Sequence, residues 1–416
     1  MTGHAKGLRN GISSRPKGKE VAANHPPDVA TGVIPGSMKR LLFVCDPLGG
    51  SMCVQLELLL SLGKSLREQY SLSVFTPHCS PDSAELLRAA NIEFLVPSRS
   101  TFGMNFILRK FEQSNESMLW AESWMREILL RSNQRAAEEA LDGRRFDRVL
   151  NMSSTVIYPC DLWWIQGTPL ELTIAGMAST NLAARMADML ARPVVAWLDG
   201  RFVREMKRVS RQIVANSPFL MELFRARQVP VSGVIYSAKD FAQFRPPDSK
   251  PSRDYVLTYV GKETERIDFH ALREAGVPVV GFGGKIPAAA RMRGITDCID
   301  FRGFVPDHEL VDLYSNAMFT LFPFSMEPFG YVPIESMACG TPVLTFDRQG
   351  PGDTVVNGRT GWLVHTCDEM VRKATELWSR GSTGISPEEC VRRAKDFSVH
   401  RSVNELTNRI ERLSPG

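Results

Sequence analysis

The sequence predicts an α/β protein made of two doubly wound, parallel-sheet domains that face a central cleft, and three observations lead to this prediction. Short β-rich apolar runs alternate along the chain with segments whose apolar residues have helical spacing. This order is typical of a parallel sheet with helices on both faces. A proline-rich polar stretch, FRPPDSKPSRD, interrupts the alternation at residues 244–254, as a linker does. The length of 416 residues allows two hydrophobic cores.

The first series of elements begins after residue 37. The runs KRLLFVC, DPLGGS and CVQLELLLSLGKSL predict a strand, a glycine turn at Gly49 and Gly50, and a helix. Further strands and a helix are predicted from LSVFT, SAELLRAA, IEFLVP, RVLNM, LWWI and QIVAN. Residues 102–141 mix aromatic, aliphatic and basic residues at near-helical spacing, which favours helices that pack on the core. The alternative for this segment is a membrane-surface or lipid-acceptor patch, and thus a peripheral membrane contact through the first domain.

The second series begins after the proline-rich linker. Its elements are predicted from DYVLTYVG, IDFHALREAG, PVVGFGG, HELVDLYSNA, FTLFPF, PIESMACG and PVLTF. We therefore divide the chain into a disordered tail (1–37), a first Rossmann-like domain (38–245) and a second one (246–395). Met38 is a candidate start of the chain. An amphipathic helix over 396–414 is expected to pack back on the first domain, in which the acceptor is expected to bind.

Composition and charge exclude several classes of protein. The chain is 43% hydrophobic and 23% charged, and no apolar run has the roughly 18 residues of a membrane helix, so we expect a cytoplasmic protein. Residues 1–37 carry three of the four net positive charges, and the nearly neutral remainder argues against a nucleic-acid partner. Neither the eight cysteines nor the seven histidines have metal-ligand spacing, so we expect no structural metal.

One segment of the second series, FPFSMEPFGYVPIESMACGTPVL at 322–344, carries distinctive chemistry. It follows an apolar strand, so Glu327 and Gly330 should lie in a loop at the carboxyl edge of the second sheet, where ligands bind in such folds. Pro333 suits the first turn of a helix, and unpaired N–H groups at a helix start bind anions. Glu335, inside that helix, can accept two vicinal hydroxyls of a ribose. Two carboxylates beside an anion site predict a nucleotide sugar as ligand.

The same residues resemble a known family. The seven-residue spacing between Glu327 and Glu335, the EPFG turn, ESMACGTPV and the downstream NGRTGWLV are similar to the donor site of family-four retaining glycosyltransferases with the GT-B fold. The resemblance covers about residues 255–366, and Gly49-Gly50 and IVANSPFLMELF extend it to the first domain. It implies transfer of a sugar from a nucleotide-diphosphate sugar to an acceptor hydroxyl, with retention at the anomeric carbon and no cofactor.

The resemblance also implies roles for single residues. Glu335 would bind the ribose, and Glu327 would contact the transferred sugar. Lys262 and Arg266, in YVGKETER, would neutralise the leaving diphosphate. Main-chain contacts to the nucleotide are implied for Phe329, Gly330 and Tyr331 at the diphosphate, for Gly49 and Gly50 across from it, and for Phe304 and Val305 at the base.

Lys262 and Arg266 are swapped in identity relative to the family pattern, and two further positions depart from it. Gln166 follows the LWWI strand where the family often carries a histidine near the acceptor. Asp353 stands where the family commonly has glutamate. The chain contains no Asp-x-Asp, which is consistent with transfer that needs no metal.

Other functions stay open at this point. Glu327 and Glu335 could form a glycosidase pair, which would place the two carboxyl groups about 5 to 5.5 Å apart. A nucleotide-sugar epimerase and a nucleotide-sugar-binding protein that has lost transfer are further alternatives. The sequence leaves open the base and sugar of the donor, the oligomeric state, and whether the acceptor is a saccharide, a lipid-linked saccharide or a small molecule.

Overall fold

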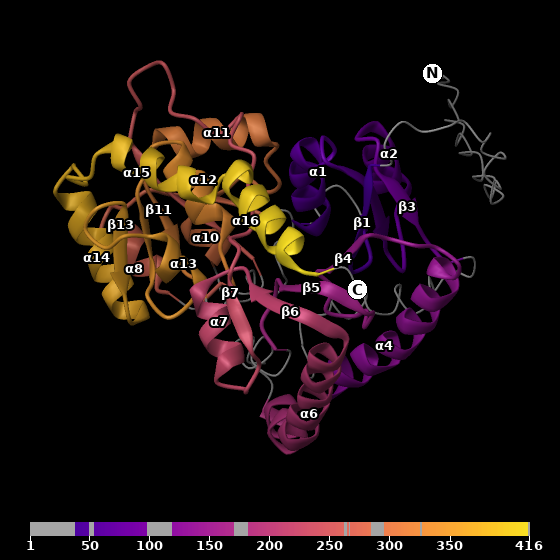
Figure 1. The fold of residues 1–416 in the computed structure, drawn as a ribbon. Helices are drawn as coiled ribbons and strands as arrows, with labels where there is room; N and C mark the ends of the chain where they lie inside the picture. Colours follow the sequence, from indigo (N-terminus) through magenta and orange to yellow (C-terminus); the bar gives the residue numbers. More distant parts are fainter. Residues whose placement is uncertain are drawn as a thin grey trace, which may run out of the picture. The chain divides into compact units, whose positions relative to one another are not determined.

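The computed structural model describes residues 38–49, 54–97, 119–169, 182–261, 264–265, 267–283, 295–324 and 327–414. Residues 38–416 form one compact unit, which contains two separate parallel sheets (Figure 1). The predicted disorder of residues 1–37 lies outside the described residues.

The first sheet has seven strands in the order β3-β2-β1-β4-β5-β6-β7, and neighbouring strands pair in parallel. The strand order changes direction between β1 and β4, which makes this the switch point of a doubly wound sheet. Its strands are β1 (Lys39–Val44), β2 (Tyr70–Phe75), β3 (Glu93–Leu95), β4 (Arg148–Asn151), β5 (Cys160–Ile165), β6 (Ser210–Ala215) and β7 (Val231–Val234).

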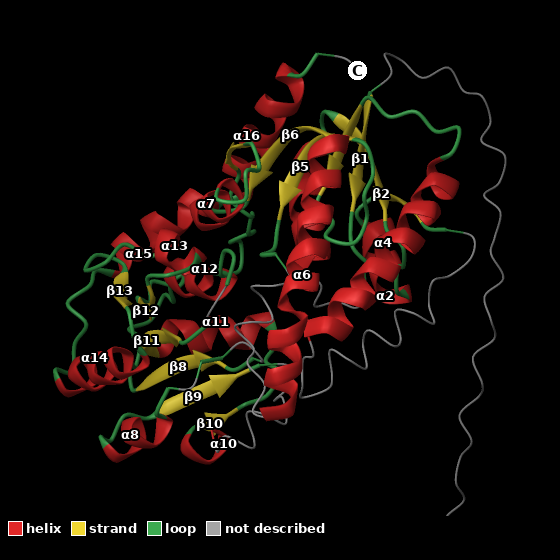
Figure 2. Cartoon of the chain, turned by 90° about the horizontal axis from the view of Figure 1, so that it is seen from below, coloured by secondary structure: helices red, strands yellow, loops and turns green. Residues whose placement is uncertain are grey.

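Helices cover this first sheet. They are α1 (Val54–Leu66), α2 (Pro81–Ala89), α4 (Leu119–Leu141), α6 (Leu182–Val209) and α7 (Pro218–Arg225). Figure 2 shows the long helices α4 and α6 side by side, and the ion pairs Arg126–Asp199 and Arg201–Glu127 join them. The helices predicted within residues 102–141 are therefore present as α4 from Leu119 onward, and residues 102–118 lie outside the described ranges.

The second sheet has six strands in the order β10-β9-β8-β11-β12-β13, again all parallel. Its switch point lies between β8 and β11. The strands are β8 (Tyr255–Tyr259), β9 (Val279–Phe282), β10 (Asp300–Phe301), β11 (Ala317–Phe322), β12 (Val343–Phe346) and β13 (Gly361–Val364). The sequence analysis did not predict the strands β7, β10 and β13, which lie at sheet edges and are two to four residues long.

Both faces of the second sheet are buried. Leu257 and Val343 face one hydrophobic cluster while their chain neighbours Val256 and Leu344 face another, as the two-residue period of a strand requires. The covering helices are α8 (Phe269–Glu274), α10 (Ile295–Cys298), α11 (Asp307–Asn316), α12 (Tyr331–Ala338), α13 (Gly350–Thr354), α14 (Cys367–Ser379), α15 (Pro387–Ala394) and the 3₁₀ turn η1 (Lys395–Phe397). Two doubly wound domains are thus present, as the alternation in the sequence predicted.

The last helix, α16 (Val399–Arg412), returns to the first sheet (Figure 1). Val403, Leu406 and Ile410 lie in the same buried cluster as residues of β1, β2 and α1. The Arg148 side chain of β4 donates to the Ile410 carbonyl at 2.8 Å. The first domain therefore includes the last helix of the chain in its core.

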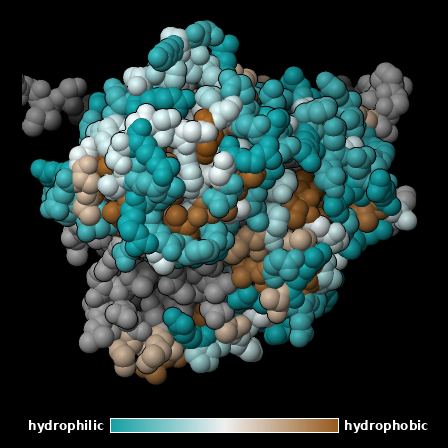
Figure 3. Space-filling model, turned by 90° about the vertical axis from the view of Figure 1, so that its left-hand side faces the viewer, coloured by the Kyte–Doolittle hydropathy of each residue, from teal (hydrophilic) through white to brown (hydrophobic). Residues whose placement is uncertain are grey.

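On the face in Figure 3, hydrophobic residues gather in separate groups within a hydrophilic surface. Within the described ranges, no helix combines the length and apolarity needed to cross a bilayer.

Candidate functional site

The loops after β8 and β11 lie beside each other at the switch point of the second sheet. Thr264 forms an isolated antiparallel bridge with Phe324, and the Glu265 N–H donates to the Pro323 carbonyl at 2.6 Å. The loop after β8 is the one that carries Lys262 and Arg266, which lie outside the described residues. The fold therefore brings the chain segment of the predicted cations next to the segment that leads to Glu327.

The Glu327 carboxylate organises its own loop. Its Oε1 atom accepts from the N–H groups of Phe329 and Gly330, at 3.3 and 3.1 Å. Its main-chain N–H donates to Gln349 Oε1 at 3.0 Å, and its carbonyl accepts from Gly350 N at 2.9 Å. Two of the three amides that the resemblance assigns to a diphosphate thus donate to Glu327 in this structure.

Gly330 is required by the backbone at this turn. Its φ is +88°, in the left-handed region, and an added Cβ would lie 2.8 Å from Pro351 Cγ. The helix α12 begins directly after it, at Tyr331, so Pro333 lies in its first turn as the sequence predicted. Glu335 consequently lies one full turn inside the helix.

Glu335 is buried, with 7% of its surface exposed. Its Oε1 atom lies 2.9 Å from Lys239 Nζ, and its Oε2 atom accepts from the Tyr314 hydroxyl at 2.9 Å. Burial raises the pKa of Glu335, and the Lys239 ammonium and the Tyr314 hydroxyl oppose this rise. The carboxylate therefore depends on its cationic neighbour to stay ionised.

The sequence analysis did not identify Lys239, which joins the two domains here. Its ammonium forms ion pairs with Glu57 in the first turn of α1 and with Glu335 in α12. Burial lowers the pKa of Lys239, but the two carboxylates outweigh burial and leave it raised. A lysine that directly follows the weakly polar run VIYSA was the available signal, but its partners are distant in sequence.

The amino end of α7 contacts the loop of Glu327. The Ser217 hydroxyl, which caps α7, donates to the Pro328 carbonyl at 2.6 Å. The Phe219 N–H donates to Asp353 Oδ2 at 2.8 Å, and burial raises the pKa of Asp353. Asp353 thus accepts a main-chain bond from the first domain.

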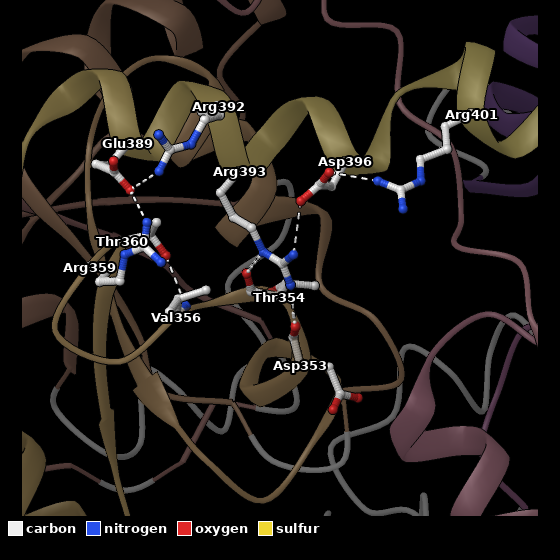
Figure 4. A network of polar contacts seen from close by, with 10 residues as sticks. All are labelled: Asp353, Thr354, Val356, Arg359, Thr360, Glu389, Arg392, Arg393, Asp396 and Arg401. Carbon is white, nitrogen blue, oxygen red and sulfur yellow. Dashed lines mark hydrogen bonds and ion pairs between the residues drawn. The ribbon is translucent and has the colours of Figure 1, made fainter.

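Arg393 fixes the main chain beside Asp353. Its guanidinium donates to the carbonyls of Asp353 and Thr354, at 2.7 and 2.9 Å, and pairs with Asp396 (Figure 4). Arg359 and Arg392 share Glu389 in the same network. These contacts tie α15 to α13 and hold the turn that presents Asp353.

A polar cluster follows the strands β5, β6 and β7. The Ser237 hydroxyl donates to Gln166 Oε1 at 2.9 Å, and Asn216 Nδ2 donates to Ser237 Oγ at 3.3 Å. Among the described residues, Gln166 Nε2 and Asn216 Oδ1 are buried atoms without a hydrogen-bond partner. The residue that stands in place of the family histidine is therefore part of an amide and hydroxyl cluster that has unused hydrogen-bonding capacity.

The switch point of the first sheet is organised by Asp46, another residue that the sequence analysis did not identify. Its carboxylate accepts from Gln55 and from the side chains and main chain of residues 153–155. Gly49, three residues on, is exposed, and Gly50 lies outside the described residues. The glycine turn that was predicted to close over the phosphates thus comes shortly after Asp46, whose carboxylate is held by several hydrogen bonds.

Phe304 and Val305 follow β10 and differ in burial. Phe304 is 59% exposed, whereas Val305 is 8% exposed and lies in a core cluster. Their main-chain contact with a base stays a prediction.

Sequence comparison supports the resemblance. Residues 280–397 match the family model described as glycosyl transferases group 1. A D-inositol 3-phosphate glycosyltransferase of Rhodococcus erythropolis is 27% identical over 234 residues, which are 49% of this chain and 52% of that protein. An alpha-1,3/1,6-mannosyltransferase of Neurospora crassa is 33% identical over 112 residues, which are 25% of this chain and 23% of that one. The chain spans about half the length of the first of these curated relatives.

Solved structures are similar over most of the chain. The Anabaena protein HepE in complex with UDP has a TM-score of 0.58 and 16% identity, and covers 90% of this chain and 100% of its own. WaaG, a glycosyltransferase of lipopolysaccharide biosynthesis, has a TM-score of 0.59 and 13% identity, with coverage of 90% and 100%. At these identities the likeness shows the fold. The chain therefore has the GT-B fold, and its residues 280–397 are similar to group 1 glycosyl transferases.

Proposed function

We propose that this protein is a retaining glycosyltransferase that moves a sugar from a nucleotide-diphosphate sugar to an acceptor hydroxyl, without a metal ion or other cofactor. One observation carries the proposal. Glu327 and Glu335 flank the amino end of α12 at the carboxyl edge of β11, next to the segment of Lys262 and Arg266. This region lies within the match to group 1 glycosyl transferases or adjoins it.

The relatives suggest which substrates to try first. HepE was solved with UDP and with UDP-glucose, so UDP-sugars are the first donors to test. The curated relatives named D-inositol 3-phosphate glycosyltransferases make inositol 3-phosphate a first acceptor.

The chemistry of the proposal is charge stabilisation at the leaving diphosphate. Negative charge grows on the phosphate as the sugar departs, and fixed N–H groups and cations stabilise it without reorganisation. The amides of Phe329 and Gly330, together with Lys262 and Arg266, fill this role. Because Glu327 now accepts from the two amides, donor binding exchanges Glu327 for phosphate oxygens and releases its carboxylate toward the sugar hydroxyls.

The Glu335 contacts argue against a glycosidase. A glycosidase needs both carboxyl groups free to act as acid and nucleophile at one bond. Glu335 is instead buried and paired with Lys239 and Tyr314. A hydroxyl-accepting role in the nucleotide site agrees better with these contacts.

A single assay separates transferase from epimerase and from an inactive binding protein. Radiolabelled UDP-, GDP- and ADP-sugars are incubated with the protein, with and without acceptor mixtures that include inositol 3-phosphate, in the presence of EDTA. A transferase releases nucleoside diphosphate only with acceptor, and the product keeps the anomeric configuration of the donor. An isomerised donor would show an epimerase, and binding without either product would show an inactive protein.

We also propose that the first domain contacts a membrane surface through α6. Five large hydrophobic residues on this helix are highly exposed, and their spacing places them along one side. They are Met186 (49%), Met189 (55%), Leu190 (74%), Val194 (48%) and Trp197 (57%). Exposed Arg192, Arg204, Lys207 and Arg208 on the same helix suit anionic headgroups.

Vesicle flotation tests this contact. With phosphatidylglycerol vesicles, the double substitution Leu190→Ser and Trp197→Ser should lower the bound fraction several-fold, since it removes apolar area from the interface. Leu86→Ser on α2 is the matched control, because Leu86 is an exposed leucine on another helix. Equal binding of all three proteins would refute the contact.

A further inference from the structure

Lys239 lies where the chain crosses between the two domains. Its main-chain N–H donates to the Phe397 carbonyl at 3.3 Å, and Lys239 forms a parallel bridge with Ser398. Residues 239 and 397–398 belong to the two segments that connect the first sheet with the second. The backbone of Lys239 is therefore held by the second connecting segment, at residues 397–398. This contact fixes the point from which the Lys239 side chain extends.

The Lys239 ammonium contacts charged groups of both domains. Glu57 comes from α1 and Glu335 from α12, while the rings of Phe244 and Tyr331 lie 4.8 and 5.9 Å from Nζ. Lys239 is 5% exposed. A buried cation in this position is held by the two carboxylates and two aromatic faces, so its place is well defined.

The hydrogen bonds of Glu335 leave one acceptor position open on each of its two carboxylate oxygens. An ionised carboxylate has about four acceptor positions, about two on each oxygen. Lys239 takes one position on Oε1 and Tyr314 takes one on Oε2. One position per oxygen therefore remains, which matches a vicinal diol that donates one hydroxyl to each oxygen.

We propose that Lys239 is a positioning residue of the nucleotide site, which holds Glu335 ionised and oriented so that each carboxylate oxygen accepts one hydroxyl of a ribose. This inference rests on the proposed function. The second ion pair of Lys239, with Glu57, reaches the first turn of α1 in the other domain.

Loss of the Lys239 charge should change the titration of Glu335. The titratable groups that face Glu335 are Lys239, Glu57, Tyr314, Tyr331 and Cys339. Lys239 is the cation among them, while burial and the Glu57 charge both favour the protonated form. Without Lys239, Glu335 takes up a proton more easily, and the neutral acid forms weaker bonds with hydroxyls.

The test compares ribose with deoxyribose. The dissociation constants of UDP and 2′-deoxy-UDP are measured by calorimetry, or those of the GDP or ADP pair if the wild type binds that base. We expect the wild type to favour the ribonucleotide by about tenfold or more, and Lys239→Met to reduce this preference to less than about threefold. Lys239→Arg keeps a cation and should restore most of the preference.

A pH series adds a second readout. The ratio of the UDP dissociation constants of Lys239→Met and wild type should fall by at least about fivefold from pH 6.0 to pH 8.5, as Glu335 regains its charge in the variant. The ratio cancels the titration of the nucleotide phosphate. A residue that only stabilises the fold would lower both affinities without changing this ratio.

Glu57→Gln is the matched control. It removes the other ion pair of the same lysine but leaves the pair with Glu335, so the ribose preference should stay within about twofold of wild type. If Lys239→Met does not fold, Lys239→Gln replaces it, because glutamine removes the charge but keeps an N–H donor.

The outcomes separate this inference from the proposed function. If no nucleoside diphosphate binds the wild type, both are overturned. If the wild type favours the ribonucleotide and the Lys239 variants keep that preference at every pH, the role of Lys239 is overturned and the proposed function stands.

Discussion

Asp46 and Glu335 are both carboxylates at the switch point of a sheet, but they differ in the role that their hydrogen bonds allow. Asp46, after β1, accepts from Gln55 and from three successive residues of the loop 153–155, so its oxygens are saturated by the protein itself. Glu335, in the helix after β11, has one partner on each oxygen. The first carboxylate holds a loop in place, whereas the second has acceptor positions left for a ligand.

The difference lies in the donors that surround each group. Asp46 meets main-chain N–H groups and hydroxyls that are supplied by a neighbouring loop of its own domain. Glu335 meets one cation and one phenol, which come from different domains or elements. The position of an acidic residue in such a sheet therefore does not assign its role. The hydrogen-bond partners of its carboxylate must be known as well.

The largest expected effect comes from the substitution of Glu327, whose loop connects β11 with α12. Glu327→Ala removes the acceptor for the Phe329 and Gly330 amides and, in the function proposed above, the acceptor for the sugar. We expect kcat to fall about 100-fold, as small misplacements of a reacting group do, while the UDP affinity changes less than about threefold. Initial rates and calorimetry measure the two quantities. A kcat within about threefold of wild type would contradict the assignment.

The second prediction concerns the carboxylate with free acceptor positions. Glu335→Ala should weaken binding of the nucleoside diphosphate by about tenfold or more, because charge-assisted bonds to the ribose are lost. Glu335→Gln keeps the volume and one acceptor oxygen and should lose less. Equal affinity of wild type and Glu335→Ala, measured by calorimetry, would remove Glu335 from the site.

The third prediction concerns the saturated carboxylate. Asp46→Asn should lower the free energy of unfolding by about 1.5 kcal/mol, because an amide cannot accept from all of these donors. Urea unfolding measures this change. Donor affinity should stay within about twofold of wild type; a large loss of affinity with unchanged stability would reverse the comparison between Asp46 and Glu335.

The smallest expected effect is the pH dependence of stability. Burial raises the pKa of Glu335 above its usual value of 4.5, so the unfolded chain loses this proton first as the pH rises. The contribution of Glu335 to stability therefore declines as the pH increases from about 4.5 through the raised pKa. Relative to Glu335→Gln, the wild type should lose stability over this range in urea unfolding. A relative gain would show that the Lys239 charge outweighs burial.

The sequence predicted most of the fold because the buried strands are strongly apolar. The runs LWWI and FTLFPF became the central strands β5 and β11, each flanked by helices as the alternation indicated. The edge strands β7 and β10 lack this signal, because an edge strand of two to four residues buries few side chains. Pro333 lies in the first turn of α12, as predicted, while the helix begins at Tyr331.

The site was predicted less completely than the fold. The spacing of Glu327 and Glu335 and the position of Gly330 in the loop before the helix could be read locally. The pairing of Glu335 with Lys239 could not, because nearly a hundred residues separate them and the contact depends on how two domains meet. The saturation of Asp46 depends in the same way on a loop more than a hundred residues away.

The place of α16 in the first domain has a consequence for biosynthesis. Val403, Leu406 and Ile410 complete a buried cluster whose other buried members all precede residue 240. A nascent chain on the ribosome thus exposes that apolar surface until α16 has been translated, whereas the second domain has all its strands earlier. The domain made first is the last to be completed, which reverses the usual order of folding during synthesis.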